Sequence, residues 1–141
     1  MILLDTNVIS EVMRPIPAPQ VIAWLDRHTA AGYAISVVTK AEILLGIALL
    51  PAGKRRDTLA ALAELTFCND FSGRIYSFDE NVANVYVKII VERRQQGLTT
   101  STEDAQIAAT AMYYGYSLAT RNIKDFVGIS ELILINPWTD C

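Results

Sequence analysis

The sequence predicts an α/β protein in which a mostly parallel central sheet carries helices on both faces. Short apolar runs alternate with longer segments of helical character, and this alternation implies crossover connections between parallel strands. The chain has 141 residues, of which 52% are hydrophobic and 19% charged, and these proportions suit a core of ordinary size. We therefore expect residues 1–141 to form a single domain.

Five apolar runs are predicted to form the buried strands of this sheet. They comprise residues 1–4, 33–37, 74–78, 116–120 and 132–135. No apolar run approaches the roughly 20 residues that cross a bilayer, and the opening "MILL" lacks the charged start of a secretory signal. We therefore expect a cytoplasmic protein with no membrane partner.

Three helices are predicted between the strands. Residues 79–97 repeat apolar side chains at helical spacing and end at a glycine, and residues 102–115 form another helix with a terminal glycine. Residues 39–50, "TKAEILLGIALL", are apolar on nearly every face, which predicts a helix buried against the sheet. The proline-rich residues 14–20 are expected to form a rigid loop between two short helices.

Four acids in the sequence each have a local explanation as helix caps. Asp5 follows the first strand directly and can cap a helix that begins near Asn7. The other three acids stand three positions after a capping residue, as in a capping box. These pairs are Thr39 with Glu42, Ser101 with Asp104, and Asn122 with Asp125.

The same four acids also have a joint explanation as a metal site. Asp5, Glu42 and Asp125 each follow a predicted strand, and the carboxyl ends of parallel strands meet at one edge of the sheet. Asp104 follows a loop, so its position depends less directly on the strands. Crowded carboxylates repel one another unless a cation lies among them, and oxygen ligands suit Mg²⁺ or Mn²⁺. The sequence therefore predicts a site for one of these cations.

Other chemistries have few candidate residues. The single histidine, His28, and two cysteines, Cys68 and Cys141, do not make a catalytic triad or a zinc cluster, and Cys68 is expected to be a small apolar filler. The net charge of −3 gives no general attraction for nucleic acid. Arg121 and Lys124 flank Asp125, and they are the candidate contacts for phosphate groups.

Four sequence blocks resemble the PIN-domain family, and their order resembles VapC-type toxins of bacterial toxin–antitoxin pairs. The blocks are "LLDTNVISE", "TKAEILLGIALL", "DAQIAATAMYYG" and "LATRNIKDF", and the closing "NPW" is similar to the FitB branch. The resemblance implies a PIN-like fold, an acidic pocket for Mg²⁺ or Mn²⁺, and ribonuclease activity on an RNA substrate. It also implies a small cognate antitoxin of the VapB type, with DNA bound only through that antitoxin, and a homodimer within a larger complex. The outer faces of helices 39–50 and 79–97 are candidate docking surfaces for a partner helix.

The resemblance also assigns residues to the site. By motif, the first three acids are Asp5, Glu42 and Asp104, and the fourth acidic position is either Asn122 or Asp125. The four acids are the candidate catalytic and metal-binding residues, with Asp5 as the central ligand. The candidate supporting polar residues are Asn7, Thr120 and Asn122. Asn7 could hydrogen-bond a carboxylate.

Two other functions compete with this hypothesis. In a phosphatase of the haloacid-dehalogenase type, Asp5 would be the nucleophile, but the general acid expected two residues later is replaced by Asn7. A catalytically silent module that only binds a partner protein or RNA is the second alternative. The complete set of acids argues against it, since a decayed site would normally carry a neutral substitution.

Overall fold

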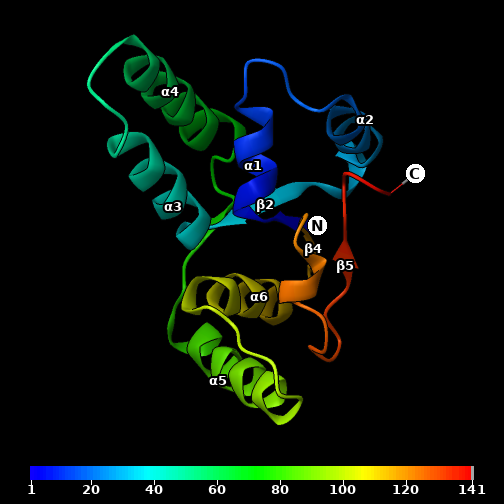
Figure 1. Cartoon of the computed structure of the whole chain (residues 1–141). Coiled ribbons are helices and arrows are strands. Elements are labelled where there is room, and N and C mark those ends of the chain that lie inside the picture. Colours follow the sequence, from blue (N-terminus) through cyan, green and yellow to red (C-terminus); the bar gives the residue numbers. More distant parts are fainter. Residues whose placement is uncertain (141) are drawn as a thin grey trace.

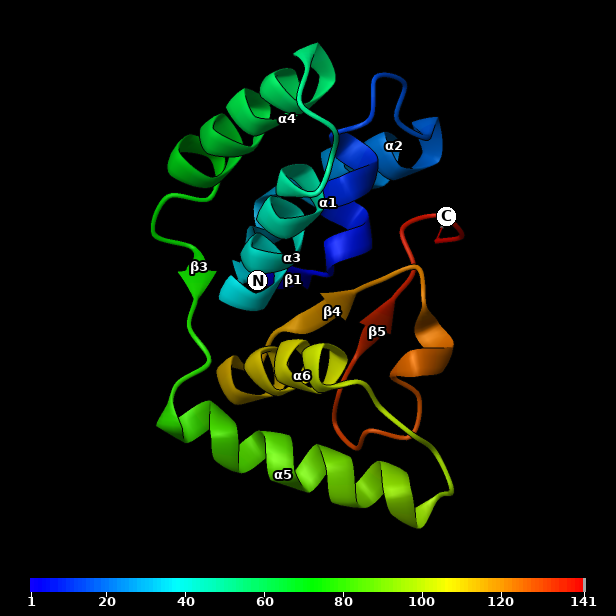
Figure 2. The same ribbon diagram turned by 60° about the vertical axis from the view of Figure 1, so that its left-hand side comes forward.

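The computed structural model describes residues 1–140 and contains a five-stranded, fully parallel sheet in the order β3-β2-β1-β4-β5 (Figures 1 and 2). This confirms the predicted α/β fold with a parallel sheet. Each strand is shorter than its apolar run because only part of the run forms ladder hydrogen bonds. The strands are β1 (Ile2–Leu4), β2 (Tyr33–Ser36), β3 (Ile75–Tyr76), β4 (Ser117–Ala119) and β5 (Leu134–Ile135).

Helices cover both faces of the sheet, as Figure 1 shows. One face carries α1 (Thr6–Val12), α2 (Pro19–Arg27), α3 (Val37–Ala48) and α4 (Lys54–Leu65). The other face carries α5 (Glu80–Gln95) and α6 (Thr102–Tyr114), which lie side by side in both views. Three short helical segments complete the described chain, namely η1 (Thr29–Ala31), the π-helix η2 (Thr66–Asp70) and η3 (Ile123–Asp125).

The central strand β1 is buried on both faces, which explains its uninterrupted apolar sequence. Ile2 and Leu4 pack into the core beneath α1 and α3, whereas Leu3 packs into the core beneath α5 and α6. Ile2 lies opposite Tyr33 on one side and Ser117 on the other, so β1 joins the two halves of the sheet. The residue that follows β1 is therefore placed at the middle of the sheet edge.

Helix α3 begins two residues earlier than predicted. Strand β2 ends at Ser36, whose hydroxyl accepts a hydrogen bond from the backbone N–H of Val38 at 3.0 Å and caps the helix. The predicted capping box of Thr39 and Glu42 is therefore wrong, because Thr39 already lies inside the helix. Glu42 lies beyond the first turn, where it does not act as a cap.

The burial predicted for α3 is also wrong. Only one stripe of the helix is buried, formed by Thr39, Ile43 and Ile47. Three leucines on its other side are exposed, namely Leu44, Leu45 and Leu49. Nearly every face of the helix is apolar in sequence, but only one face is buried, because α4 and the sheet cover only part of its surface.

Two of the remaining caps are confirmed and one is not. Asp5 accepts the backbone N–H of Thr6 at 2.8 Å, and Ser101 accepts that of Asp104 at 3.1 Å. The Asn122 side chain makes no cap hydrogen bond, so the predicted capping box of Asn122 and Asp125 is wrong. The turn is closed instead through its backbone, where the Asp125 N–H donates to the Asn122 carbonyl at 3.0 Å.

Two further sequence-based expectations concern the surface. No helix within residues 1–140 is long and apolar enough to cross a membrane. Cys68 lies exposed on η2, so its predicted role as an apolar filler is wrong. Cys141 lies outside the described residues.

Candidate metal-binding active site

A pocket of about 450 Å³ opens at the carboxyl edge of the sheet. Asp5 follows β1, Thr120 follows β4, and α3 starts immediately after β2 and carries Glu42. The pocket lining combines four acids, two arginines and several polar or aromatic side chains. The lining residues are Asp5, Thr6, Asn7, Ser10, Glu11, Arg14, Glu42, Asp104, Arg121, Asn122 and Trp138.

Asp5 is the most firmly held of the predicted acids. Its side chain is only 4% exposed, and its Oδ2 accepts hydrogen bonds from Thr120 Oγ1 at 2.7 Å and Asn7 Nδ2 at 3.2 Å. The backbone N–H of Thr6 binds its Oδ1. These bonds fix the carboxylate in one orientation, and they place the predicted supporting residues Asn7 and Thr120 directly against it. Asn7 therefore donates to Asp5 and has no proton to transfer as a phosphatase general acid would.

Glu42 reaches the pocket from the exposed part of α3. The hydroxyl of Thr6 lies 2.7 Å from its Oε1 and 3.1 Å from the hydroxyl of Thr39. Thr6 therefore links the first residue of α1 to the acid on α3. Thr6 was not among the predicted site residues, although its position beside Asp5 in the "LDTN" block was a signal for it.

Asp104 lies in the first turn of α6, where its surroundings disfavour its charge. Burial and the negative charge of Asp5 raise its pKa to about 6, with smaller contributions from Asp125 and Glu42, although the Ser101 hydroxyl opposes the rise. Burial likewise raises the pKa of Asp5, and the charges of Glu42 and Asp125 add to that effect. The four predicted acids thus influence one another at this edge.

The fourth acidic position divides into two residues with different locations. Asn122 lines the pocket, and its backbone N–H donates to Thr120 Oγ1 at 3.0 Å. Asp125 does not line the pocket, but its charge raises the pKa of both Asp5 and Asp104. Lys124 is exposed and does not line the pocket either, whereas Arg121 does. Of the two predicted phosphate contacts, only Arg121 is therefore part of this pocket.

The donor set fits Mg²⁺ or Mn²⁺, although the acids surround the pocket instead of converging on one point. Within residues 1–140, no three acidic, histidine or cysteine side chains already lie close enough together to hold a metal ion. The available donors are oxygen atoms, which both cations prefer. A cation among the acids would also relieve the repulsion that raises the pKa of Asp104.

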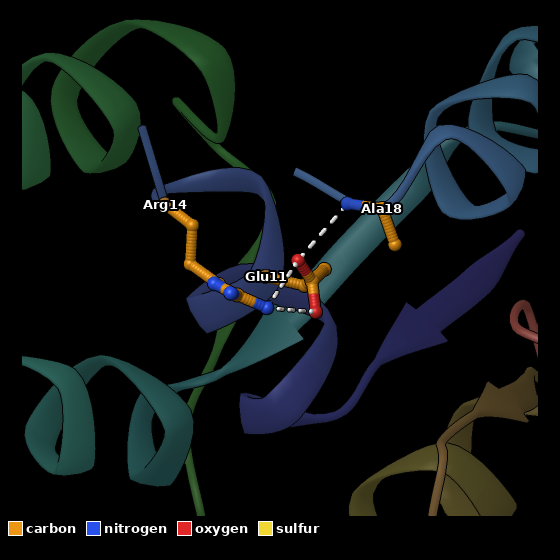
Figure 3. A network of polar contacts seen from close by, with 3 residues as sticks. All are labelled: Glu11, Arg14 and Ala18. Carbon is orange, nitrogen blue, oxygen red and sulfur yellow. Dashed lines mark hydrogen bonds and ion pairs between the residues drawn. The ribbon is translucent and has the colours of Figure 1, made fainter. Parts of the chain in front are cut away.

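Two charged residues of the pocket, Glu11 and Arg14, were missed in the sequence. Figure 3 shows Glu11 between the Arg14 guanidinium and the backbone of Ala18. The Ala18 N–H lowers the pKa of Glu11, and the charges of Arg14 and Arg121 act in the same direction against the effect of burial. A signal was present for Glu11, which stands four residues after Asn7 and therefore on the same face of α1, whereas Arg14 lies beyond the end of this helix at Val12.

Known proteins resemble this chain over its whole length. The family model for the PIN domain matches residues 2–131. Toxin FitB of Neisseria gonorrhoeae is 41% identical over 140 residues, which cover 99% of this chain and 100% of that protein. VapC ribonuclease Y4jK of Sinorhizobium fredii is 36% identical over 138 residues, or 98% of each chain. A solved structure described as FitAB bound to an IR36 DNA fragment contains a chain with 40% identity and a TM-score of 0.92, and the match covers 100% of this chain and 98% of that one. The chain belongs to the PIN-domain family, within the group that includes FitB and the VapC proteins.

Proposed function

We propose that this protein is the toxin of a toxin–antitoxin pair and hydrolyses RNA phosphodiester bonds at a carboxylate site that binds Mg²⁺ or Mn²⁺. The observation that carries the proposal is the pocket at the sheet edge, lined by Asp5, Glu42 and Asp104. The relationship to a protein named VapC ribonuclease supports RNA as the substrate.

The roles of the acids follow from how each is held. Asp5 is fixed by Thr120 and Asn7, so we assign it the central position among the metal ligands. We assign Asp104 as a second metal ligand beside Asp5. Glu42 is exposed, and it binds the metal or orients the attacking water. A bound Mg²⁺ or Mn²⁺ supplies an activated water and offsets the charge that develops on the phosphate.

Asn122 and Asp125 receive different roles. Asn122 lies in the pocket lining, where its amide can hydrogen-bond but adds no charge. Asp125 lies outside the lining, and we assign it an outer carboxylate role that tunes the metal ligands by charge.

The proposed partners are a small antitoxin of the VapB type and, through it, DNA. The FitAB assembly bound to DNA supports this proposal. The exposed leucines of α3, Leu44 and Leu45, offer an apolar surface to a partner helix. An adjoining groove of about 800 Å³ shares Thr6 and Glu42 with the acidic pocket. A partner in that groove would therefore cover the site.

One experiment tests the proposed chemistry directly. Purified, partner-free protein is incubated with total RNA with and without Mg²⁺, and the cleavage ends are sequenced. Wild type should cleave only with metal, whereas Asp5→Asn and Asp104→Asn should lose cleavage. Asp57→Asn is the matched control because Asp57 is an acid in the first turn of α4, as Asp104 is in α6, but it is exposed and does not line the pocket. Cleavage that persists in chelator or in both site variants contradicts the mechanism.

A further inference from the structure

The structure assigns a second function to the acidic pocket, because its lining also contains Arg14 and Arg121. We propose that these two guanidinium groups bind a phosphate of the RNA chain that neighbours the phosphate being cleaved. The proposal rests on the ribonuclease function proposed above and extends it to how a polymeric substrate is held. It also assigns Glu11 the task of positioning Arg14.

Arg14 is held by one terminal guanidinium nitrogen, and its other guanidinium nitrogens are open. Its Nη1 lies 3.3 Å from Glu11 Oε1 and 3.2 Å from Glu11 Oε2, while the side chain of Arg14 is 63% exposed. Glu11 is only 5% exposed, and its Oε2 also accepts the Ala18 N–H at 3.0 Å. Figure 3 shows this arrangement, in which one guanidinium nitrogen faces Glu11. The other guanidinium nitrogens have no hydrogen bond within residues 1–140, so they can bind a ligand.

Glu11 is therefore an anchor and not a fifth metal ligand. Its oxygens are already occupied by Arg14 and Ala18. Because a buried carboxylate must keep its partners, Glu11 restrains Arg14 at the pocket. Because Arg14 is already restrained, it loses less conformational entropy when it binds an anion.

Arg121 is also presented in a defined orientation. Its guanidinium carbon lies 5.0 Å from the centre of the Trp138 ring, and its backbone N–H donates to Asn7 Oδ1 at 3.3 Å. Asn7 donates in turn to Asp5, so this backbone contact ties the arginine to the central acid. Within the described chain, Arg121 forms no ion pair, and its charge remains available to a ligand.

Phosphate is the ligand that these groups suit. A guanidinium group presents several N–H donors in a planar fork that matches phosphate oxygens. The protein has a net charge of −3, so general electrostatics do not attract RNA. The pocket supplies the attraction locally, with carboxylates for a metal ion and arginines for a backbone phosphate.

The test measures RNA binding separately from cleavage. A fluorescent RNA oligonucleotide is titrated into Asp5→Asn protein and into the same protein carrying Arg14→Ala, at several salt concentrations. Arg14→Ala should raise the dissociation constant about tenfold and reduce the salt slope by about one, as expected for one lost phosphate contact. Arg14→Gln should behave in the same way, which guards against an effect of side-chain truncation. Arg94→Ala, at an exposed arginine on α5, should leave both quantities unchanged.

The outcomes distinguish this inference from the proposed ribonuclease function. An unchanged salt slope in both Arg14 variants, or an equal loss in Arg94→Ala, overturns the phosphate subsite. Failure of the wild type to cleave RNA with metal contradicts the ribonuclease function instead, whatever the binding data show. Melting temperatures of all variants establish that each has folded.

Discussion

Asp104 is a carboxylate whose charge its own pocket opposes. Its pKa of about 6 lies above the ordinary value of 3.8 because of burial first and the charge of Asp5 second. Between these two pH values the folded protein holds a proton that the unfolded chain has released. Stability of the metal-free protein therefore falls as the pH rises from about 4 through about 6. The site is built for a cation at some cost in stability without one.

Replacing Asp104 by asparagine should stabilise the metal-free protein near neutral pH. The expected gain at about pH 7.5 is roughly 1–2 kcal/mol, less than the full pKa shift implies, because solvent screens a half-buried group. Urea unfolding in chelator at several pH values measures it, and the variant should show a weaker pH dependence than wild type. Asp57→Asn should change little at neutral pH. A loss of stability in Asp104→Asn contradicts this electrostatic account.

Asp125 should affect metal binding more than folding. Because it acts by charge near Asp5 and Asp104, Asp125→Asn should weaken Mn²⁺ affinity about 10–100-fold with little change in melting temperature. Asn122→Ala should cost no cap stability, since the Asn122 side chain makes no cap bond. Calorimetric titration with Mn²⁺ and thermal melts check both variants. Equal Mn²⁺ affinity in wild type and Asp125→Asn would leave a site of three carboxylates.

At the scale of elements, one buried arginine joins the segments that carry two of the acids. Arg93 on α5 is 2% exposed and donates to Thr100 Oγ1 at 2.8 Å, to the Thr99 carbonyl at 3.2 Å and to the Val127 carbonyl. Thr99 and Thr100 lie just before α6, which carries Asp104. Val127 follows η3, which ends at Asp125. The guanidinium group therefore ties together two loops at the site.

Arg93→Lys should destabilise the protein although it keeps the charge. A lysine ammonium cannot reproduce the planar fork with which this buried guanidinium serves three acceptors, so at least one of its charged hydrogen bonds is lost, at an expected cost of about 2–3 kcal/mol. Denaturant unfolding measures the loss. The neighbouring exposed Arg94 provides the control, and Arg94→Lys should have an effect near zero. Similar stability of the two variants means that Arg93 does not connect the loops energetically.

Periodicity predicted the elements better than it predicted their ends. The apolar runs located all five strands, because strands buried on both faces must be apolar along their length. The start of α3 was misplaced because a serine at the end of β2 is an equally good cap as Thr39, and only the strand's actual end decides between them. Glu11 and Arg14 were missed because charged side chains usually face solvent, and only the tertiary fold directs these two into the pocket.

At the scale of the whole molecule, the exposed apolar surface beside the site bears on partner binding. Leu45 is 59% exposed on α3, near the groove that shares Glu42 with the acidic pocket. Val87, 57% exposed, lies on α5 on the other face of the sheet. Both helices were predicted docking surfaces, but only the surface on α3 adjoins the site.

Expression of the protein alone should arrest growth, and co-expression of its antitoxin should relieve the arrest. Leu45→Asp should remain toxic and escape the antitoxin, because a charge at this surface disfavours an apolar partner helix. Val87→Asp is the matched control and should still be neutralised, whereas Asp5→Asn should be harmless. Growth curves and co-purification measure these outcomes. Neutralisation of Leu45→Asp combined with escape of Val87→Asp would move the docking surface to α5.

The place of β1 between β2 and β4 has a consequence for synthesis of the protein. Asp5 is translated long before the hydroxyl that orients it, which belongs to Thr120, 115 positions later in the chain. Asp104 and Arg121 are also translated late. A nascent chain therefore carries Asp5 with Thr6 and Asn7 but without Thr120 until those 115 positions have been translated. The cell that makes this protein meets a complete pocket only after Asp104, Arg121 and Trp138 have also emerged.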